Sequence, residues 1–538
     1  MRMLKEHLNT ISEHLLSARA IRPVAPMNVR PGHWCERACQ AELRAKVPSG
    51  EPAGNAAATE ELRRYHLQRL TATLSGMTAE SAAEEAARDI HALLGTATWT
   101  DISAGDPYRF DPSGIDAAFA RTACALATAL NVLRKPLSAI SAALPARIEA
   151  EINRSVLPQL SGATLPDMPL PTACLLLICV VLGSTVESRR WNAVRSLCLL
   201  IDQKLHRLPA DGSMPGGIEY AAQTAVLLMD AMEVLAAATG GETDLTQHER
   251  IVCMADYPLF AHLQSGVFVN PGEHVMQCEI AAESLFRFGR RAGDGALCDL
   301  TAWLLRNDRA RMSDHLISRL LDRDTLPALE ETPGRIRLFR DGCLPDAGVM
   351  FMRGFNLHIS MTGATDTSHA DAGNICLYHK EQPVLVDIGP GAADTCLHSL
   401  PTIGGIGQRT HVPSRAVECG SGDETTTCYT ASLTAAYPPQ CHVSDYQRTL
   451  LMGSKVAPGI RLMDMIELTR PEEVDFHFIC RYEPEPARGG MYIGPVLLRW
   501  NGDLTCAVEH LPEYSAWRLT LRAPASDRQR HIFDIIPK

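Results

Sequence analysis

The hydrophobic period of this chain changes once, near residue 335, and that change limits the folds open to it. From about residue 60, apolar residues recur every three or four positions, which is the period of an amphipathic helix, in segments such as ELRRYHLQRLTATLSG and IDAAFARTACALATALNVL. Beyond residue 335 the apolar segments are short, β-rich and bounded by turns, as in GVMFMRG and LHISMTG. A run of helices followed by a run of strands predicts two separate domains.

The helical segments form a series of antiparallel pairs. Such a series suits an α/α toroid or solenoid better than a four-helix bundle. We place the helical domain at residues 61–330 and the β-rich domain at residues 335–538, which gives an α+β multidomain protein. Residues 1–60 form an N-terminal extension that we expect to be partly irregular, because segment 46–61 is small, polar and carries Pro and Gly.

Composition is that of an ordinary globular protein, with 46% hydrophobic and 21% charged residues. The N-terminal segment carries charges throughout and lacks the apolar region of a secretory signal. The longest apolar run, Ala173–Leu182, is too short to span a bilayer and predicts a buried helix. We therefore expect a cytoplasmic protein without a membrane partner, whose 17 cysteines are reduced thiols. The net charge of −11 argues against a nucleic-acid partner.

Histidines and aspartates gather around two short apolar runs in residues 365–408. The succession NICLY, HKEQP, VLVDIG predicts a strand, a turn and a strand. Asp387 would end a buried strand, where a lone carboxylate needs a partner. His369, Asp371 and His398 are close in the sequence, and imidazole and carboxylate are ligand types for a divalent metal such as zinc. An equally simple interpretation makes His369 and Asp371 loop residues that hydrogen-bond to nearby backbone.

Three motifs in this stretch resemble the β-sandwich core of heparinase II/III-like proteins, a polysaccharide lyase family. Residues 368–374 (SHADAGN) are similar to its H-x-H-N-D-x-G-N/S-F segment, although Thr367 stands where the family has the first His. Residues 383–389 (PVLVDIG) and 397–408 (LHSLPTIGGIGQ) are similar to its P-V-L-x-D-x-G and Y-H-N-x-P-x-I-N-G-x-x-Q segments. The resemblance extends from about residue 60 to the end. It implies an N-terminal α/α toroid, an incomplete barrel of helical hairpins, followed by a C-terminal antiparallel β-sandwich.

A fourth motif, residues 211–220 (DGSMPGGIEY), resembles the family's D-G-x-x-x-E-G-x-x-Y segment, whose tyrosine is the catalytic acid/base. Tyr220 falls on that register, whereas Gly216 replaces the family's Glu and Ala221 replaces the aromatic residue that usually follows. The resemblance thus implies that Tyr220 is the catalytic residue. The alternative is a turn followed by a tyrosine at the start of a helix, without a catalytic role.

The activity that the resemblance implies is a lyase that cleaves uronate-containing oligosaccharides or polysaccharides, heparin- or heparan-sulfate-like or alginate-like, by β-elimination. This reaction removes the weakly acidic C5 proton and expels the 4-O leaving group, so donors or a cation must neutralise the charge that develops on the carboxylate. A tyrosine, with an ordinary pKa of about 10, can take that proton and return one to the leaving oxygen. In the family an Asn or His of the toroid assists, but the corresponding residues 165–170 (LPDMPL) contain neither.

A metal is also implied by the resemblance. In zinc-binding family members a His of the H-x-H pair and the Asp after the hairpin are ligands, which corresponds to His369 and Asp387. We add His398 as a third ligand from its placement. Such a zinc ion would be structural, and we expect no organic cofactor because no phosphate-cradling glycine motif is present. The alternative is a hydrogen-bonded His–Asp pair without metal.

Two other functions are compatible with the sequence. Thr367 and the changed segment 165–170 favour a catalytically degenerate member that binds glycan or serves as a scaffold. Asp211 and Glu219 would suit a toroid-fold glycoside hydrolase with paired carboxylates, although a turn and a first helical turn explain both acids. An acidic chain also repels a polyanionic substrate unless the protein has a local basic groove. The sequence leaves a homodimer open.

Overall fold

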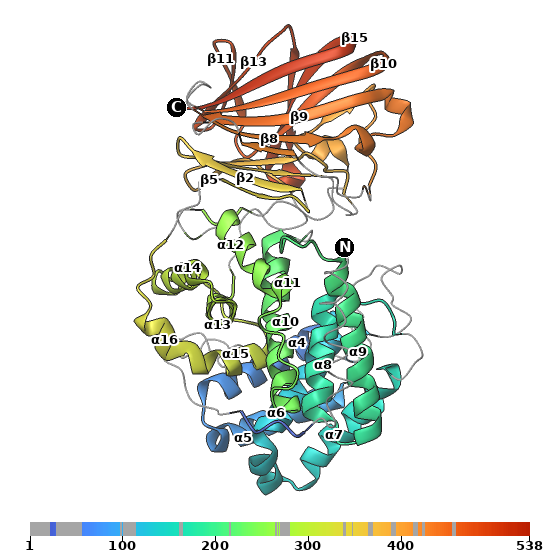
Figure 1. Cartoon of the computed structure of the whole chain (residues 1–538), viewed down its shortest axis with the longest axis vertical. Helices are drawn as coiled ribbons and strands as arrows, with labels where there is room; N and C mark the ends of the chain where they lie inside the picture. Colours follow the sequence, from blue (N-terminus) through green and yellow to red (C-terminus); the bar gives the residue numbers. More distant parts are fainter. Residues whose placement is uncertain are drawn as a thin grey trace. The chain divides into compact units, whose positions relative to one another are not determined.

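Two compact units make up the chain in the computed structural model (Figure 1). The first comprises residues 1–208, 223–252 and 280–334, and the second comprises residues 209–222, 253–279 and 335–538. Segments 209–222 and 253–279, which we placed in the helical domain, therefore group with the strands. The structure describes residues 22–27, 56–96, 99, 115–160, 165–214, 217–263, 266, 268–269, 280–336, 341–346, 348–363, 369–388, 394–410, 412, 418–421, 426–453 and 459–538.

Successive helices build the first unit, and several begin at a side-chain cap. Asp116 accepts a hydrogen bond from Phe119 N at 2.7 Å, and Asp294 accepts one from Leu297 N at 2.8 Å, which satisfies a backbone donor that the helix cannot pair. The α-helices that lie wholly or partly in this unit are α4 (Ala56–Gly76), α5 (Ala79–Gly95), α6 (Ala117–Ile140), α7 (Ala143–Ser155), α8 (Leu170–Gly183), α9 (Glu187–Arg207), α10 (Gly217–Thr239), α11 (Glu249–Val252), α13 (Ala282–Ala292), α14 (Gly295–Arg306), α15 (Leu316–Asp322) and α16 (Leu326–Glu331).

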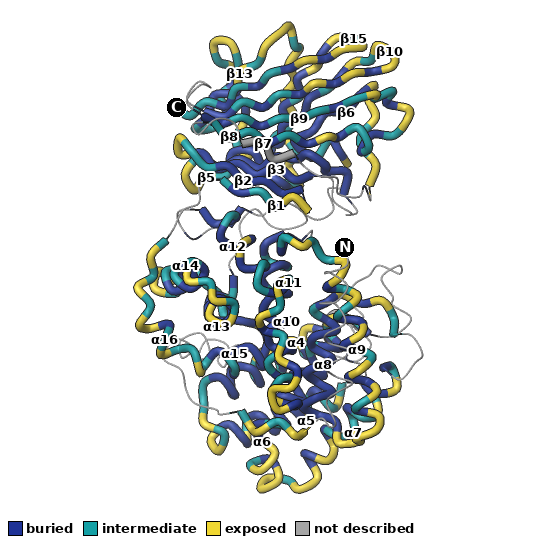
Figure 2. The backbone as a smooth tube through the Cα atoms, in the orientation of Figure 1, coloured by how far each residue is buried: buried dark blue, intermediate teal, exposed yellow. Residues whose placement is uncertain are grey.

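The core of this unit contains α8, which is buried along nearly its whole length (Figure 2). This confirms the prediction of a buried helix from its continuous apolar run. Gly183, the last residue of α8, leaves no room for a side chain, because a Cβ there would lie 2.5 Å from Ile152 Cδ1 and 2.9 Å from Ala127 Cβ. α10 is long and apolar enough to cross a membrane, but 78% of its apolar window is buried, as is usual for a helix in a protein core.

The helices close into a ring. α4, α5, α6, α8 and α9 pack in succession, and α15, near the end of the unit, packs against both α4 and α6. Arg323, just after α15, donates to Leu74 O of α4 at 3.0 Å. The last helices therefore meet the first one, as the predicted α/α toroid requires.

Antiparallel strands build most of the second unit, and they form a two-layered sandwich. Figure 1 shows β2 and β5 in one layer and β9, β10 and β15 in the other. Apolar side chains of both layers share one core, which includes Met350, Ile359, Leu450 and Phe533. The strands are β1 (Asp341–Leu344), β2 (Val349–Gly354), β3 (Leu357–Thr362), β4 (Ile375–His379), β5 (Gln382–Leu385), β6 (Pro401–Ile403), β7 (Glu418–Ser421), β8 (Thr426–Ser432), β9 (Val443–Gly453), β10 (Ile460–Cys480), β11 (Pro484–Ala487), β12 (Gly490–Ile493), β13 (Val496–Trp500), β14 (Thr505–Leu511) and β15 (Ala516–Pro537).

Two long strands organise the sandwich. β10 and β15 pair along their lengths, with register shifts between Glu467 and Val474 that bend the pair. Before the shifts β10 also pairs with β9, and after them it pairs with β6 and β5. The second half of β10 thus anchors the strands that flank the His- and Asp-rich stretch 365–408.

The remaining segments of the second unit pack on β1 and β2. The ring of Phe260, in α12 (Asp256–Ala261), stacks on Phe351 with centroids 6.4 Å apart. Gly342 permits this contact, because a Cβ there would lie 2.3 Å from the Phe260 ring. The fold therefore matches the predicted toroid and sandwich. One expectation about the thiols is wrong, because Cys343 is disulfide-bonded.

Candidate functional site

Tyr220 lies in the first turn of α10 and is half-buried. The loop before it is fixed within the second unit by Asp211. One carboxylate oxygen of Asp211 accepts from Ser213 N at 3.0 Å, and the other accepts from Asp346 N at 2.8 Å, in the turn between β1 and β2. Ala210 N in turn donates to the Asp346 carboxylate at 2.6 Å. These bonds hold the start of α10 against the strands.

A structural role accounts for the Asp211 carboxylate. The Asp211 carboxylate is already occupied by the backbone and hydroxyl donors of Ser213 and by Asp346 N. Gly212 follows it at φ 77°, where a Cβ would lie 2.3 Å from Cys253 O. The Asp211–Gly212 pair therefore shapes a turn, and Glu219 sits in the first turn of α10, where the helix dipole favours an acid.

The side chains of His369, Asp371, Asp387 and His398 come together in the sandwich, and all four are buried. The two imidazole rings have centroids 5.8 Å apart, and His398 Nδ1 is 3.8 Å from Asp387 Oδ2. Burial raises the pKa of Asp371, and the neighbouring charge of Asp387 raises it further, whereas His398 and His369 act in the opposite direction. The four groups therefore form one electrostatic cluster.

Asn374 organises this cluster, a role that we did not assign from the sequence. Its Nδ2 donates to Asp387 Oδ2 at 2.8 Å. Its Oδ1 accepts from Ile375 N and from Ser399 N, both at 2.9 Å. A single buried amide therefore joins the start of β4, Asp387 two residues after β5, and the loop that carries His398. The only sequence signal was its place at the end of the SHADAGN motif.

Arg448 and Asp464 support the cluster from the other layer, and we predicted neither residue from the sequence. They form a bidentate pair between β9 and β10 at 2.7 and 2.9 Å, and both side chains are buried. Arg448 Nη1 also donates to Gly373 O at 3.0 Å and to Ser399 O at 2.7 Å. The guanidinium thus fixes the backbone at Gly373, just before Asn374, and at Ser399, whose N–H donates to Asn374.

The donor chemistry of the cluster suits a divalent metal, but its arrangement falls short of a ligand set. Both ring nitrogens of His398 are buried and form no hydrogen bond with the described residues. Yet the described part of the chain holds no group of three or more His, Cys, Asp or Glu placed to bind a metal ion. Asp387 Oδ2 is also engaged by Asn374. We therefore assign no chemical step to a metal, and the zinc site at His369, Asp387 and His398 stays a prediction.

Residues 165–170 correspond to the family's Asn- or His-bearing segment of the toroid but contain neither residue. Asp167, their acidic residue, is 78% exposed and pairs with Lys204 of α9. Thr367 lies outside the described residues.

Taken together, a ring of helical hairpins and an antiparallel sandwich with a buried His/Asp cluster define the fold of the toroid-type polysaccharide lyases. No family model and no curated protein matches the sequence. Among solved structures, heparinase III superimposes with a TM-score of 0.58 at 12% identity, covering 98% of this chain and 89% of that one. Heparan sulfate lyase HepC from Pedobacter heparinus gives 0.58 at 13% identity over 99% and 88%. A Paenibacillus xanthan lyase gives 0.53 at 10% identity over 99% and 57%. These likenesses establish the fold.

Proposed function

We propose that this protein is a lyase that cleaves uronate-containing oligosaccharides or polysaccharides, heparin- or heparan-sulfate-like or alginate-like, by β-elimination. The observation that carries the proposal is the position of Tyr220. It opens α10 behind a loop that Asp211 and Asp346 hold rigidly. Heparinase III, a heparan sulfate lyase and a xanthan lyase share the fold.

Tyr220 would act as both base and acid. A phenol has an ordinary pKa of about 10, so Tyr220 must first give its proton to solvent and be present as a stabilised phenolate before it can take the C5 proton of the uronate. It then returns a proton to the 4-O leaving group. The carboxylate charge that grows during C5 deprotonation must meet a preorganised donor or cation, and since residues 165–170 supply none, a basic group elsewhere in the chain has to do so.

The test is the Tyr220→Phe variant, which keeps the ring and removes the hydroxyl. We expect it to lose about 10²–10⁴-fold in rate, the contribution of a positioned acid/base. The measurement is the ultraviolet absorbance of the unsaturated uronate product over a panel of heparin, heparan sulfate, chondroitin, hyaluronan and alginate oligosaccharides. Tyr514→Phe, a half-buried tyrosine of the sandwich, is the matched control and should keep full activity.

The other outcomes discriminate between the alternatives. Equal rates for the Tyr220→Phe variant and the wild type would exclude Tyr220 as the acid/base. No product from any substrate, with glycan binding retained, would favour a catalytically degenerate binding or scaffold protein. The structural zinc at His369, Asp387 and His398 is a separate proposal, which metal analysis of protein purified without chelators would refute by finding no zinc.

A further inference from the structure

A cavity of about 140 Å³ lies within the first unit, where α15 meets α4 and α6 and closes the helical ring. α4, α6, α8 and α15 contribute its walls, and α15 packs against both α4 and α6. Its volume is roughly ten times the 10–15 Å³ that one water needs, so a carboxylate or sulfate group has room. Its charged and polar lining includes Arg63, Arg64, Arg121, Arg319 and His315, together with the carboxylate of Asp314, which pairs with Arg311 at 2.9 Å.

Two of these arginines are already neutralised. Arg63 Nε donates to Glu60 Oε2 at 2.8 Å, and Arg64 Nε donates to Glu60 Oε1 at 2.7 Å, so both share one carboxylate. Arg63 is further held by Thr122 Oγ1 at 2.8 Å. Glu60 therefore engages both guanidiniums on this wall of the cavity.

Arg121 is the cation that lacks a counter-charge. Its Nε is buried and forms no hydrogen bond with any described residue, and no described carboxylate lies within ion-pair distance of it. Burial lowers the pKa of Arg121, and the charges of Arg63 and Arg64 lower it further, although Asp314 acts in the opposite direction. Burying a charge without a hydrogen-bonded partner is costly, and an anion in the cavity would remove that cost.

His315 does not supply a further positive charge. Burial lowers its pKa to about 3, so the imidazole is neutral near pH 7. Its Nε2 lies 2.9 Å from Gln223 Nε2, in α10 one helical turn after Tyr220. His315 therefore lines the cavity as a neutral polar group.

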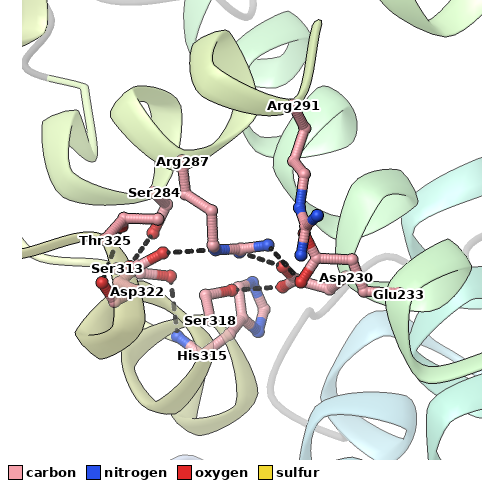
Figure 3. Close-up of polar contacts among 10 residues, drawn as sticks. All are labelled: Asp230, Glu233, Ser284, Arg287, Arg291, Ser313, His315, Ser318, Asp322 and Thr325. Atoms are coloured by element: carbon pink, nitrogen blue, oxygen red, sulfur yellow. Dashed lines mark hydrogen bonds and ion pairs between the residues drawn. The ribbon is translucent and has the colours of Figure 1, made fainter. Parts of the chain in front are cut away.

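A buried ion network holds this wall in place. Figure 3 shows Arg287 of α13 between Asp230 of α10 and Asp322 of α15. Arg287 Nε donates to Asp322 Oδ1 at 2.8 Å, and Ser318 donates to Asp230. The network fixes α15, which carries Arg319 and follows His315, so the cavity is preorganised rather than formed by mobile surface side chains.

We propose that this cavity binds a carboxylate or sulfate group of an acidic glycan, with Arg121 as its charged partner. A guanidinium binds either group through paired, charge-assisted hydrogen bonds. The choice of a glycan as the ligand rests on the proposed lyase function, whereas the affinity for an oxyanion rests on the cavity alone. The cavity also provides the local basic site that a chain of net charge −11 needs for such a ligand.

The test is calorimetric binding in a Tyr220→Phe background, which separates binding from turnover. Three tetrasaccharides are compared: an unsulfated glucuronate-containing one, its N-sulfated form and its carboxyl-reduced neutral form. We expect Arg121→Gln to weaken binding of the acidic ligands about 10- to 100-fold, the effect of losing one charged hydrogen-bonded pair. The affinity of Arg121→Lys, which keeps the charge, should lie between the affinities of the parent and of Arg121→Gln. Arg195→Gln, an exposed arginine of α9, should bind like the parent.

Each result has one meaning. A similar loss for the unsulfated and the N-sulfated acid identifies the carboxylate as the group bound, whereas a loss only for the N-sulfated form identifies the sulfate. Unchanged affinity in both Arg121 variants, or no binding of any acidic ligand by the parent, overturns the proposal whatever the turnover assay shows. Inorganic sulfate binding as tightly as the glycans would overturn the glycan assignment.

Discussion

Asn374 ties together three backbone segments of the sandwich with one side chain. We expect Asn374→Ala to lower the free energy of unfolding by several kcal/mol, because each buried donor or acceptor left unpaired costs about 1–3 kcal/mol. The groups affected would be Ile375 N, Ser399 N and the Asp387 carboxylate. Urea denaturation of the variant measures the change. Asn192→Ala, at an exposed asparagine of α9, should change stability by less than about 0.5 kcal/mol.

Equal stabilities for these two variants would show that the Asn374 amide is not structurally required. The sequence contained part of this answer. The succession NICLY, HKEQP, VLVDIG predicts a strand, a turn and a strand, and such a hairpin brings Asn374 and Asp387 to the same end, although we predicted no contact between them. The bond from Ser399 N was not predictable, because 25 residues separate it from Asn374 and only the folded sandwich sets that distance.

At the scale of elements, α15 is held by the buried network in Figure 3. Arg287→Met keeps most of the side-chain volume but leaves Asp230 and Asp322 buried without their counter-charge. We expect a loss of about 3–5 kcal/mol in the free energy of unfolding, the usual cost of breaking a buried pair from one side. Arg291→Met is the matched control, because Arg291 lies on the same helix and pairs with Glu233 but is 57% exposed, so it should cost below about 1 kcal/mol.

A similar loss in both variants would mean that burial of the network does not matter. The helices themselves were predictable, because the 3–4 residue period and the fully apolar run of α8 are local signals. The network was not, since Arg287 lies 57 residues from Asp230 and 35 from Asp322. The same holds for the arginine-lined cavity, whose walls come from residues 63–71, 121–125 and 314–319. Ring closure alone brings these segments together.

At the scale of the whole molecule, buried titratable groups divide unequally between the two units. The second unit contains His262 and His477, whose pKa values burial lowers to about 3 and about 4, and His358, whose pKa burial also lowers, beside the carboxyl of Asp371, whose pKa burial raises. The first unit contains His315, with a pKa of about 3, but also Asp230 and Asp322, whose pKa values burial raises to about 6. The histidines and these aspartates affect stability in opposite directions as pH falls.

A histidine with a lowered folded pKa contributes stability that is present above its unfolded pKa of about 6.5 and is lost as pH falls toward the folded pKa. At pH 5 each such group costs up to about 2 kcal/mol. A carboxyl with a raised folded pKa binds its proton more tightly in the folded state. Protonation of Asp230 and of Asp322 therefore each raises the free energy of unfolding by about 1 kcal/mol between pH 7 and pH 5. Acidification should therefore destabilise the second unit more than the first. Hydrogen exchange at pH 7 and pH 5, corrected for intrinsic rates, would show greater loss of protection in residues 341–538 than in residues 56–208, and equal losses would contradict this assignment of buried charge.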